Sequence, residues 1–189
     1  MRLLDDLEQL FERRGTARYE LNAPTGVSQT QHALQCAALA VQAGAVDTLV
    51  GAALLHDLGH LLHDDDSDQA CDGCDDVHQY MALSFLRPWF PASVLEPIKL
   101  HVDAKRYLCH AEPEYWGGLS LGSQRSLELQ GGPFDEERAA AFAGLPFAPQ
   151  AIALRRWDDR AKVPAAKAPP FSTYRALLIR IRTGRPGTV

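Results

Sequence analysis

The chain has 189 residues, 46% of them hydrophobic and 23% charged, which is the composition of a soluble globular protein long enough to bury a core. Its net charge of -5 argues against nucleic acid or a membrane surface as a partner, because both favour a basic face. No apolar run reaches membrane-spanning length, and the acidic amphipathic N-terminus is unlike a signal peptide. We therefore expect one domain over residues 1–189 and a cytoplasmic protein with reduced cysteines.

Helical periodicity dominates the sequence and strand alternation is nearly absent, which predicts an all-α fold. In chain order, the predicted helices cover residues 2–14, 28–42, 47–62, 76–86, 91–108, 133–143, 152–159 and 171–182. Ser28 is a typical N-cap, and Pro91 stands where a helix can begin. The connecting stretches at 63–75 and 163–170 are expected to be surface loops, and residues 109–132 to be less regular.

A His-Asp pair lies in the middle of the otherwise apolar helix predicted over 47–62. His56 and Asp57 are followed by Gly59 and His60. A buried aspartate is costly unless it is paired or bound to a metal. Adjacent helical side chains point about 100° apart, yet both can reach one metal cluster beside the helix, with Asp57 able to bridge two ions. The pair alone leaves two interpretations open, a core salt bridge and a metal site.

The wider histidine pattern favours the metal site. Four histidines recur about one helix and one turn apart, on successive predicted helices: His32, His56, His78 and His101. Helices of similar length bring such positions to one level of a bundle, and Asp158 adds a late carboxylate. Imidazole together with carboxylate suits iron, manganese or zinc better than calcium, and the number of ligands suits a two-metal cluster with open positions.

Two further groups of potential ligands carry less weight. His60 follows His56 by one helical turn, so we expect it to face the same site, either orienting a ligand or contacting a substrate. Cys71 and Cys74 have the spacing of half a zinc site, but no second pair stands at a useful distance. A polar turn that happens to hold two cysteines is the preferred interpretation of that segment.

Longer motifs surround these ligands, and they resemble a known family. They include Ala52-Ala53-Leu54-Leu55-His56-Asp57-x-Gly59-His60, His101-Val102-x-Ala104-Lys105-Arg106-Tyr107-Leu108, Ser126-Leu127-x-Leu129-Gln130-Gly131-Gly132-Pro133 and Arg155-Arg156-Trp157-Asp158-Asp159-x-Ala161-Lys162. The chain is similar over nearly its whole length to the mixed-valent di-iron oxygenases of the HD-domain class. That group includes myo-inositol oxygenase and 2-amino-1-hydroxyethylphosphonate dioxygenase, and the second is the better match.

The resemblance implies an HD-type helical bundle around a dinuclear centre of two iron ions, Fe2+ and Fe3+. One iron would be held by His32, His56 and Asp158, and the other by His78 and His101, with Asp57 bridging them. The implied reaction uses O2 to break the C–P bond of a small phosphonate and releases phosphate.

The resemblance also implies a substrate pocket. Lys105 lies on the same helix face as His101 and would bind a phosphonate oxygen, with further hydrogen bonds from Ser123, Ser126 and Gln130. Relatives that act on a primary amine look like Tyr-x-x-Glu where this chain has Asn22 and Thr25. A trimethylammonium group has no N–H and prefers aromatic faces or diffuse negative charge, which the nearby Tyr19 and Glu20 could provide.

The sequence therefore favours 1-hydroxy-2-(trimethylammonio)ethylphosphonate as substrate, with phosphate and glycine betaine as products. The same reaction on 2-amino-1-hydroxyethylphosphonate, giving glycine, stays open. A separate hydroxylase could make either substrate. An HD-type metal-dependent phosphohydrolase is the alternative from another enzyme class, and a non-catalytic metal- or ligand-binding module is a third.

Overall fold

The computed structural model describes residues 2–19, 26–62 and 77–183, without the side chains of Arg2, Val77 and His78. Within those ranges the chain is all-α, as predicted: the elements are α-helices and one 3-10 turn, and one isolated β-bridge joins Arg18 to Ser28. Residues predicted to matter that fall outside the described ranges are Glu20, Asn22, Thr25, Cys71 and Cys74.

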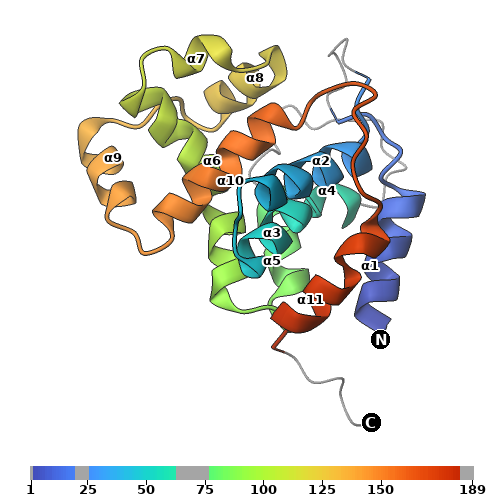
Figure 1. Ribbon diagram of the computed structural model, residues 1–189. Coiled ribbons are helices and arrows are strands. Elements are labelled where there is room, and N and C mark those ends of the chain that lie inside the picture. The colour runs from blue at the N-terminus through green and yellow to red at the C-terminus, as the bar shows by residue number, and fades with distance from the viewer. Residues whose placement is uncertain (1, 20–25, 63–76, 184–189) are drawn as a thin grey trace.

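The helices follow one another with short connections. Their bounds are α1 (Arg2–Arg13), α2 (Gln29–Gln42), α3 (Asp47–Leu55), α4 (Gly59–Leu62), α5 (Val77–Leu86), α6 (Ala92–Ala111), α7 (Tyr115–Gly118), α8 (Leu121–Leu129), α9 (Glu136–Ala143), α10 (Ala148–Arg160), the 3-10 turn η1 (Phe171–Tyr174) and α11 (Arg175–Ile181). Figure 1 shows α7, α8 and α9 gathered around one end of α6, with α1 and α11 on the other side of the molecule.

The start of α2 is fixed by local hydrogen bonds. Ser28 accepts from the Gln31 backbone N–H, and the Gln31 side chain accepts from the Ser28 N–H, so the two form a capping box. At the other end Gly44 has a φ of 69°, a conformation that glycine adopts without strain. The predicted bounds of this helix are confirmed, and His32 is thereby held one turn inside it.

The single helix predicted over 47–62 is wrong in its second half. α3 ends at Leu55, a turn covers 56–58, and α4 begins at Gly59. Around the turn, backbone N–H groups bond to the third residue before them, as from Leu58 to Leu55 and from His60 to Asp57. The Ala53 carbonyl also faces the His56 imidazole at 3.0 Å. The helical path therefore tightens where the His-Asp pair stands.

Residues 109–132, predicted to be less regular, contain two helices. Ser120 is the N-cap of α8 and accepts from the Ser123 backbone N–H. Later bounds also shift: α9 begins after the N-cap Asp135, α10 already begins at Ala148, and the predicted last helix opens with the 3-10 turn η1. Each of these elements begins at a capping residue or a proline, a local signal that hydrophobic periodicity does not include.

The core has two hydrophobic clusters that share α6 and α10. The larger cluster contains residues of helices α1 through α5, of α11, of the first half of α6 and of α10. It includes Ile98 and Leu154. The smaller one packs α9 against the second half of α6 and the start of α10, and includes Ala104 and Ala151. Because α6 and α10 take part in both clusters, they are anchored on both sides.

Among the described residues no helix has both the length and the apolarity to cross a membrane.

Replacing Ser28 with alanine should lower the free energy of unfolding by about 1 kcal/mol, because the capping box of α2 is lost. Urea denaturation followed by circular dichroism measures the change. Ser84→Ala is the control, since this exposed hydroxyl only bonds back to Tyr80 in the same helix. Equal stability of the Ser28→Ala variant and the native protein would show that the cap does not hold α2.

Candidate metal centre

Three buried imidazoles are oriented by backbone carbonyls. The Nδ1 atoms of His32, His56 and His101 lie 2.9, 3.0 and 2.6 Å from the carbonyl oxygens of Ala161, Ala53 and Ile98. A carbonyl oxygen can only accept, so each Nδ1 carries its proton and donates it. Nε2 is then the nitrogen of each ring that points inward, which is the orientation of a metal-ligating histidine.

The inward Nε2 atoms meet two carboxylates. The Nε2 of His32 lies 3.3 Å from that of His56 and 3.4 Å from Asp158 Oδ1. Asp57 Oδ2 lies 3.5 Å from His32 Nε2 and 3.2 Å from His56 Nε2. The other oxygen of the same carboxylate, Oδ1, lies 3.7 Å from His101 Nε2. Asp57 therefore faces His32 and His56 with one oxygen and His101 with the other, an arrangement that suits a bridging carboxylate.

These atoms come from elements that are far apart in sequence. His32 lies on α2, His56 and Asp57 in the turn after α3, His101 on α6 and Asp158 on α10. The five side chains are at most 8% exposed. Figure 1 shows α2, α3, α6 and α10 meeting in the middle of the molecule. The structure thus brings together five of the six predicted ligands.

The sixth predicted ligand, His78, lies on α5, but its side chain is outside the described residues. α5 packs against α4 and α6. His60, predicted to face the site, is exposed at the start of α4. Its role toward a ligand or substrate stays a prediction.

The centre contains more acceptors than donors. Three imidazole lone pairs and the carboxylate oxygens converge in a buried space, where like partial charges repel unless a cation lies between them. Suitable ligand atoms of His32, His56 and Asp158 lie within 4.8 Å of one another, close enough to hold one metal ion. Neutral nitrogen and carboxylate oxygen ligands together fit iron, manganese or zinc.

Protonation partly relieves this repulsion when no metal is bound. Burial alone would lower the pKa of His56, but the charge and hydrogen bond of Asp57 outweigh it and raise that pKa to about 9. Burial dominates at His101 and lowers its pKa to about 4, so this ring is neutral at pH 7. Burial would raise the pKa of Asp57, yet His56 holds it well below its usual value.

Asp158 is positioned by a buried arginine. Arg155 Nη1 lies 2.8 Å from Asp158 Oδ2, and its Nη2 also pairs with Asp159, which accepts from the Tyr115 hydroxyl. Burial would raise the pKa of Asp158, but Arg155 holds it well below its usual value. Sequence reasoning assigned no role to Arg155 or Tyr115. The spacing of Arg155 from Asp158 and Asp159, three and four residues, is a signal that could have identified the arginine.

Tyr19 lies directly against two of the ligands. Its ring stacks on the His32 imidazole, with 3.7 Å between centroids, and its hydroxyl donates to Asp158 Oδ1 at 3.2 Å. The ammonium of Lys162 lies 5.2 Å from the centroid of the same ring. A backbone hydrogen bond from Tyr19 to Val27 holds the segment. The sequence offered the ring of Tyr19 as a surface for a cationic substrate group. In the structure His32 and Lys162 already lie against that ring.

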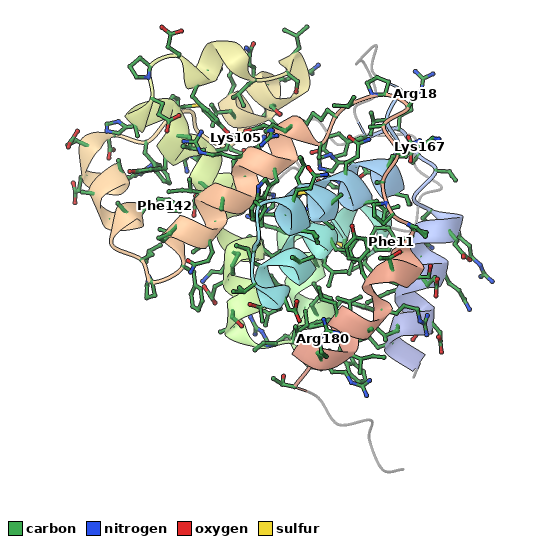
Figure 2. The ribbon with its side chains drawn as sticks, in the orientation of Figure 1. Phe11, Arg18, Lys105, Phe142, Lys167 and Arg180 are labelled. Carbon is green, nitrogen blue, oxygen red and sulfur yellow. The ribbon has the colours of Figure 1, made fainter. Side chains whose placement is uncertain are left out.

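The residues predicted to bind the phosphonate lie close to Arg155, the partner of Asp158. Lys105 is 3% exposed, and its Nζ donates to Ser126 Oγ at 2.6 Å. Ser126 in turn donates to the Ser123 carbonyl, and Arg155 Nη2 donates to Ser123 Oγ at 3.4 Å. Gln130 is buried at the end of α8. Figure 2 shows Lys105 where α6, α8 and α10 come together.

Fold and site define an all-helical protein with a buried His/Asp centre suited to a redox-active or hydrolytic metal. A search against models of known protein families finds no match. The chain is 43% identical to hydroxymethylphosphonate dioxygenase of Gimesia maris over 89% of its own length and 82% of that protein. It is 36% identical to 1-hydroxy-2-(trimethylamino)ethylphosphonate dioxygenase, glycine-betaine-forming, of Leisingera caerulea, over 91% and 86% of the two chains.

An uncharacterised protein of Acanthamoeba polyphaga mimivirus is 33% identical over 90% of this chain and 77% of the viral protein. The chain belongs to the family of the phosphonate dioxygenases. The resemblance stated from the sequence is thereby confirmed at the level of the family.

Metal binding should release a proton from His56. In the metal-free protein this ring keeps its proton up to about pH 9, against a usual pKa of 6.5, so its stabilising pair with Asp57 is complete below pH 6.5 and is lost as the pH rises through 9. A metal on Nε2 must displace that proton. Fe(II) affinity should therefore rise by about tenfold per pH unit up to pH 9.

Anaerobic calorimetry of Fe(II) binding, in buffers of different ionisation enthalpy, counts the protons released. His110→Gln serves as control, because this histidine contacts only Glu136 among the described ion pairs, outside the centre. Fe(II) affinity that stays constant between pH 6.5 and 9 would contradict the assignment of the bound proton to His56.

Proposed function

We propose that this protein uses iron and O2 to break the C–P bond of a 1-hydroxyphosphonate. The proposal is supported above all by Arg155, which contacts both the candidate metal centre and the residues predicted to bind the phosphonate. Its guanidinium holds Asp158 at the candidate metal centre and also bonds Ser123 in the pocket that contains Lys105. A substrate bound there has its phosphonate end next to the metal ligands.

Two iron ions fit the ligands that the structure describes. His32, His56 and Asp158 would hold one ion, and His101 the other together with His78, while the two oxygens of Asp57 would bridge them. When bound, such an iron pair supplies the activation of O2 that a dioxygenase requires. The carbonyl partners of the imidazoles keep the ligand geometry rigid, so little reorganisation is needed when substrate arrives.

The pocket residues orient the substrate. The ammonium of Lys105 and the hydroxyl of Ser123 offer charge-assisted and neutral hydrogen bonds to phosphonate oxygens. Ser126 accepts from Lys105 and so holds the ammonium in place, and Gln130 lies at the end of the same helix. Burial of Lys105 excludes bulk water, which strengthens its attraction for a dianion. The hydroxyl-bearing carbon is thereby directed toward the iron ligands. A hydroxyl must already stand on that carbon, so a separate hydroxylase is the class of enzyme that would supply the substrate.

Hydroxymethylphosphonate is the substrate that the site supports best. The relative that acts on it shares 43% identity, and the ring of Tyr19 is already in contact with Lys162. The positive charge of Lys162 opposes a trimethylammonium group at this ring. Overall, hydroxymethylphosphonate and O2 would give formate, phosphate and one proton, a balance in which carbon is oxidised and both oxygen atoms enter the products.

The trimethylammonium substrate favoured by the sequence is the second candidate. The relative from Leisingera caerulea that bears this name covers 91% of the chain at 36% identity. That substrate would give phosphate and glycine betaine. The primary amine, which would give glycine, is the third, and the segment that distinguishes the two amines contains Asn22 and Thr25, outside the described residues.

Phosphate release with and without O2 tests the proposal. The iron-loaded protein should release phosphate from hydroxymethylphosphonate only in the presence of O2, with one formate per phosphate. Phosphate release from the trimethylammonium substrate and from the primary amine should be slower. His56→Ala should reduce the rate by more than about 100-fold, since even residues that only orient ligands have effects of that size. His110→Ala, which changes a histidine outside the centre, should keep the native rate.

Two results would contradict the proposal. Equal phosphate release under nitrogen would make the protein a hydrolase instead. A higher kcat/KM for the trimethylammonium substrate than for hydroxymethylphosphonate would overturn the choice of substrate and leave the C–P cleavage itself standing.

A further inference from the structure

Lys162 lies just beyond the end of α10 and approaches the same serines as Lys105 from a different part of the chain. Its Nζ donates to Ser123 Oγ at 2.9 Å and to Ser120 Oγ at 3.3 Å, both at the N-terminal part of α8. Lys105, from α6, donates to Ser126 one turn further along the same helix. Two ammonium groups, one on α6 and one just beyond α10, therefore approach one short row of serine hydroxyls.

The hydroxyl of Ser123 has a proton for which the described residues provide no acceptor. A serine oxygen can accept two hydrogen bonds and donate one. Ser123 Oγ accepts from Lys162 and, at 3.4 Å, from Arg155, so both lone pairs are used. Among the described residues nothing accepts its proton, although the side chain is only 7% exposed. A buried hydroxyl between two cations, with a proton to donate, is suited to an anionic oxygen.

The charges agree with this reading. Arg155 is engaged by Asp158 and Asp159, so its charge is largely offset within the protein. A phosphonate dianion is stabilised better by two ammonium groups than by Lys105 alone, because each buried negative charge needs a positive group nearby. Three phosphonate oxygens also match the two ammonium groups and the hydroxyls between them.

We propose that Lys162 is a second phosphonate-binding residue, which forms with Lys105 a two-lysine site across Ser120, Ser123 and Ser126. The proposal rests on the proposed function, because it takes the phosphonate to bind in this pocket. It assigns to Lys162 the recognition of the second negative charge, so Lys162 distinguishes a dianion from a monoanion of the same shape.

The test measures binding without turnover. Methylphosphonate and methanesulfonate have the same shape, but near pH 8.5 the first is a dianion and the second a monoanion, and neither carries the reactive hydroxyl. Calorimetry on iron-loaded protein without O2 gives both dissociation constants. Lys162→Met should weaken methylphosphonate binding by about 10- to 100-fold, the loss of one charge-assisted hydrogen bond, and affect methanesulfonate much less. Lys162→Arg should restore part of the preference.

Lys167→Met is the matched control, because this lysine is exposed on the connection after α10 and lies away from Lys105 in Figure 2. It should bind both ligands as the native protein does. Ser123→Ala removes the hydroxyl without touching either lysine, and should weaken methylphosphonate binding by a smaller factor. In turnover, Lys162→Met should raise KM for the hydroxyphosphonate more than it lowers kcat.

An unchanged preference for the dianion in Lys162→Met would overturn the proposal, and so would a native protein that does not bind methylphosphonate. If Lys162→Met does not fold, an unchanged preference in Ser123→Ala would overturn it. The two levels of inference can fail separately. A native protein that binds methylphosphonate through Lys162 but cleaves no hydroxyphosphonate would support the lysine pair and refute the proposed function.

Discussion

The centre depends on three imidazole protons being donated to backbone carbonyls. Because those carbonyls can only accept, the tautomer of each ring is fixed, and every inward-facing nitrogen is an acceptor. Two carboxylates complete a buried group of atoms that repel one another. The raised pKa of His56 is the consequence when only a proton is available, and it is also why that proton must leave when a metal binds. A single constraint on hydrogen bonding thus determines geometry, charge and metal affinity.

The same helices that carry the predicted ligands connect the candidate centre to the predicted phosphonate-binding residues. α6 provides His101 and, one turn later, Lys105; α10 provides Arg155 and Asp158. Both helices take part in the two hydrophobic clusters, so their relative position is fixed by packing on both sides. Arg155 completes the connection through one guanidinium, which bonds the ligand Asp158 and the pocket residue Ser123. Removing that arginine would leave a buried carboxylate without its cation, which is a large penalty.

Much of this could be predicted from the sequence, and the rest depends on contacts between distant residues. The histidine spacing predicted that His32, His56 and His101 would converge, although His56 lies in the turn after α3 and not within a helix. Ser28 marked the start of its helix through local chemistry alone. The orientation of His32 could not be predicted, since its carbonyl partner is Ala161, 129 residues away. α8 was missed because glycines stand on both sides of it, and two of its leucines are exposed, which weakens the periodic signal. The contacts of Arg155 and Lys162 with Ser123 depend on α8, so they were missed with it.

The helices that carry the predicted phosphonate-binding residues differ in how firmly they are held. α6 and α10 bury apolar residues along their length, whereas α8 buries only Leu127 and Ser123, and exposes Leu121 and Leu129. Polar contacts supply the rest of its attachment, among them those of Lys105 and Lys162 to its serines. A phosphonate held between these lysines and the serine hydroxyls would add contacts to the least anchored helix. Its binding free energy would therefore also stabilise α8 against local opening.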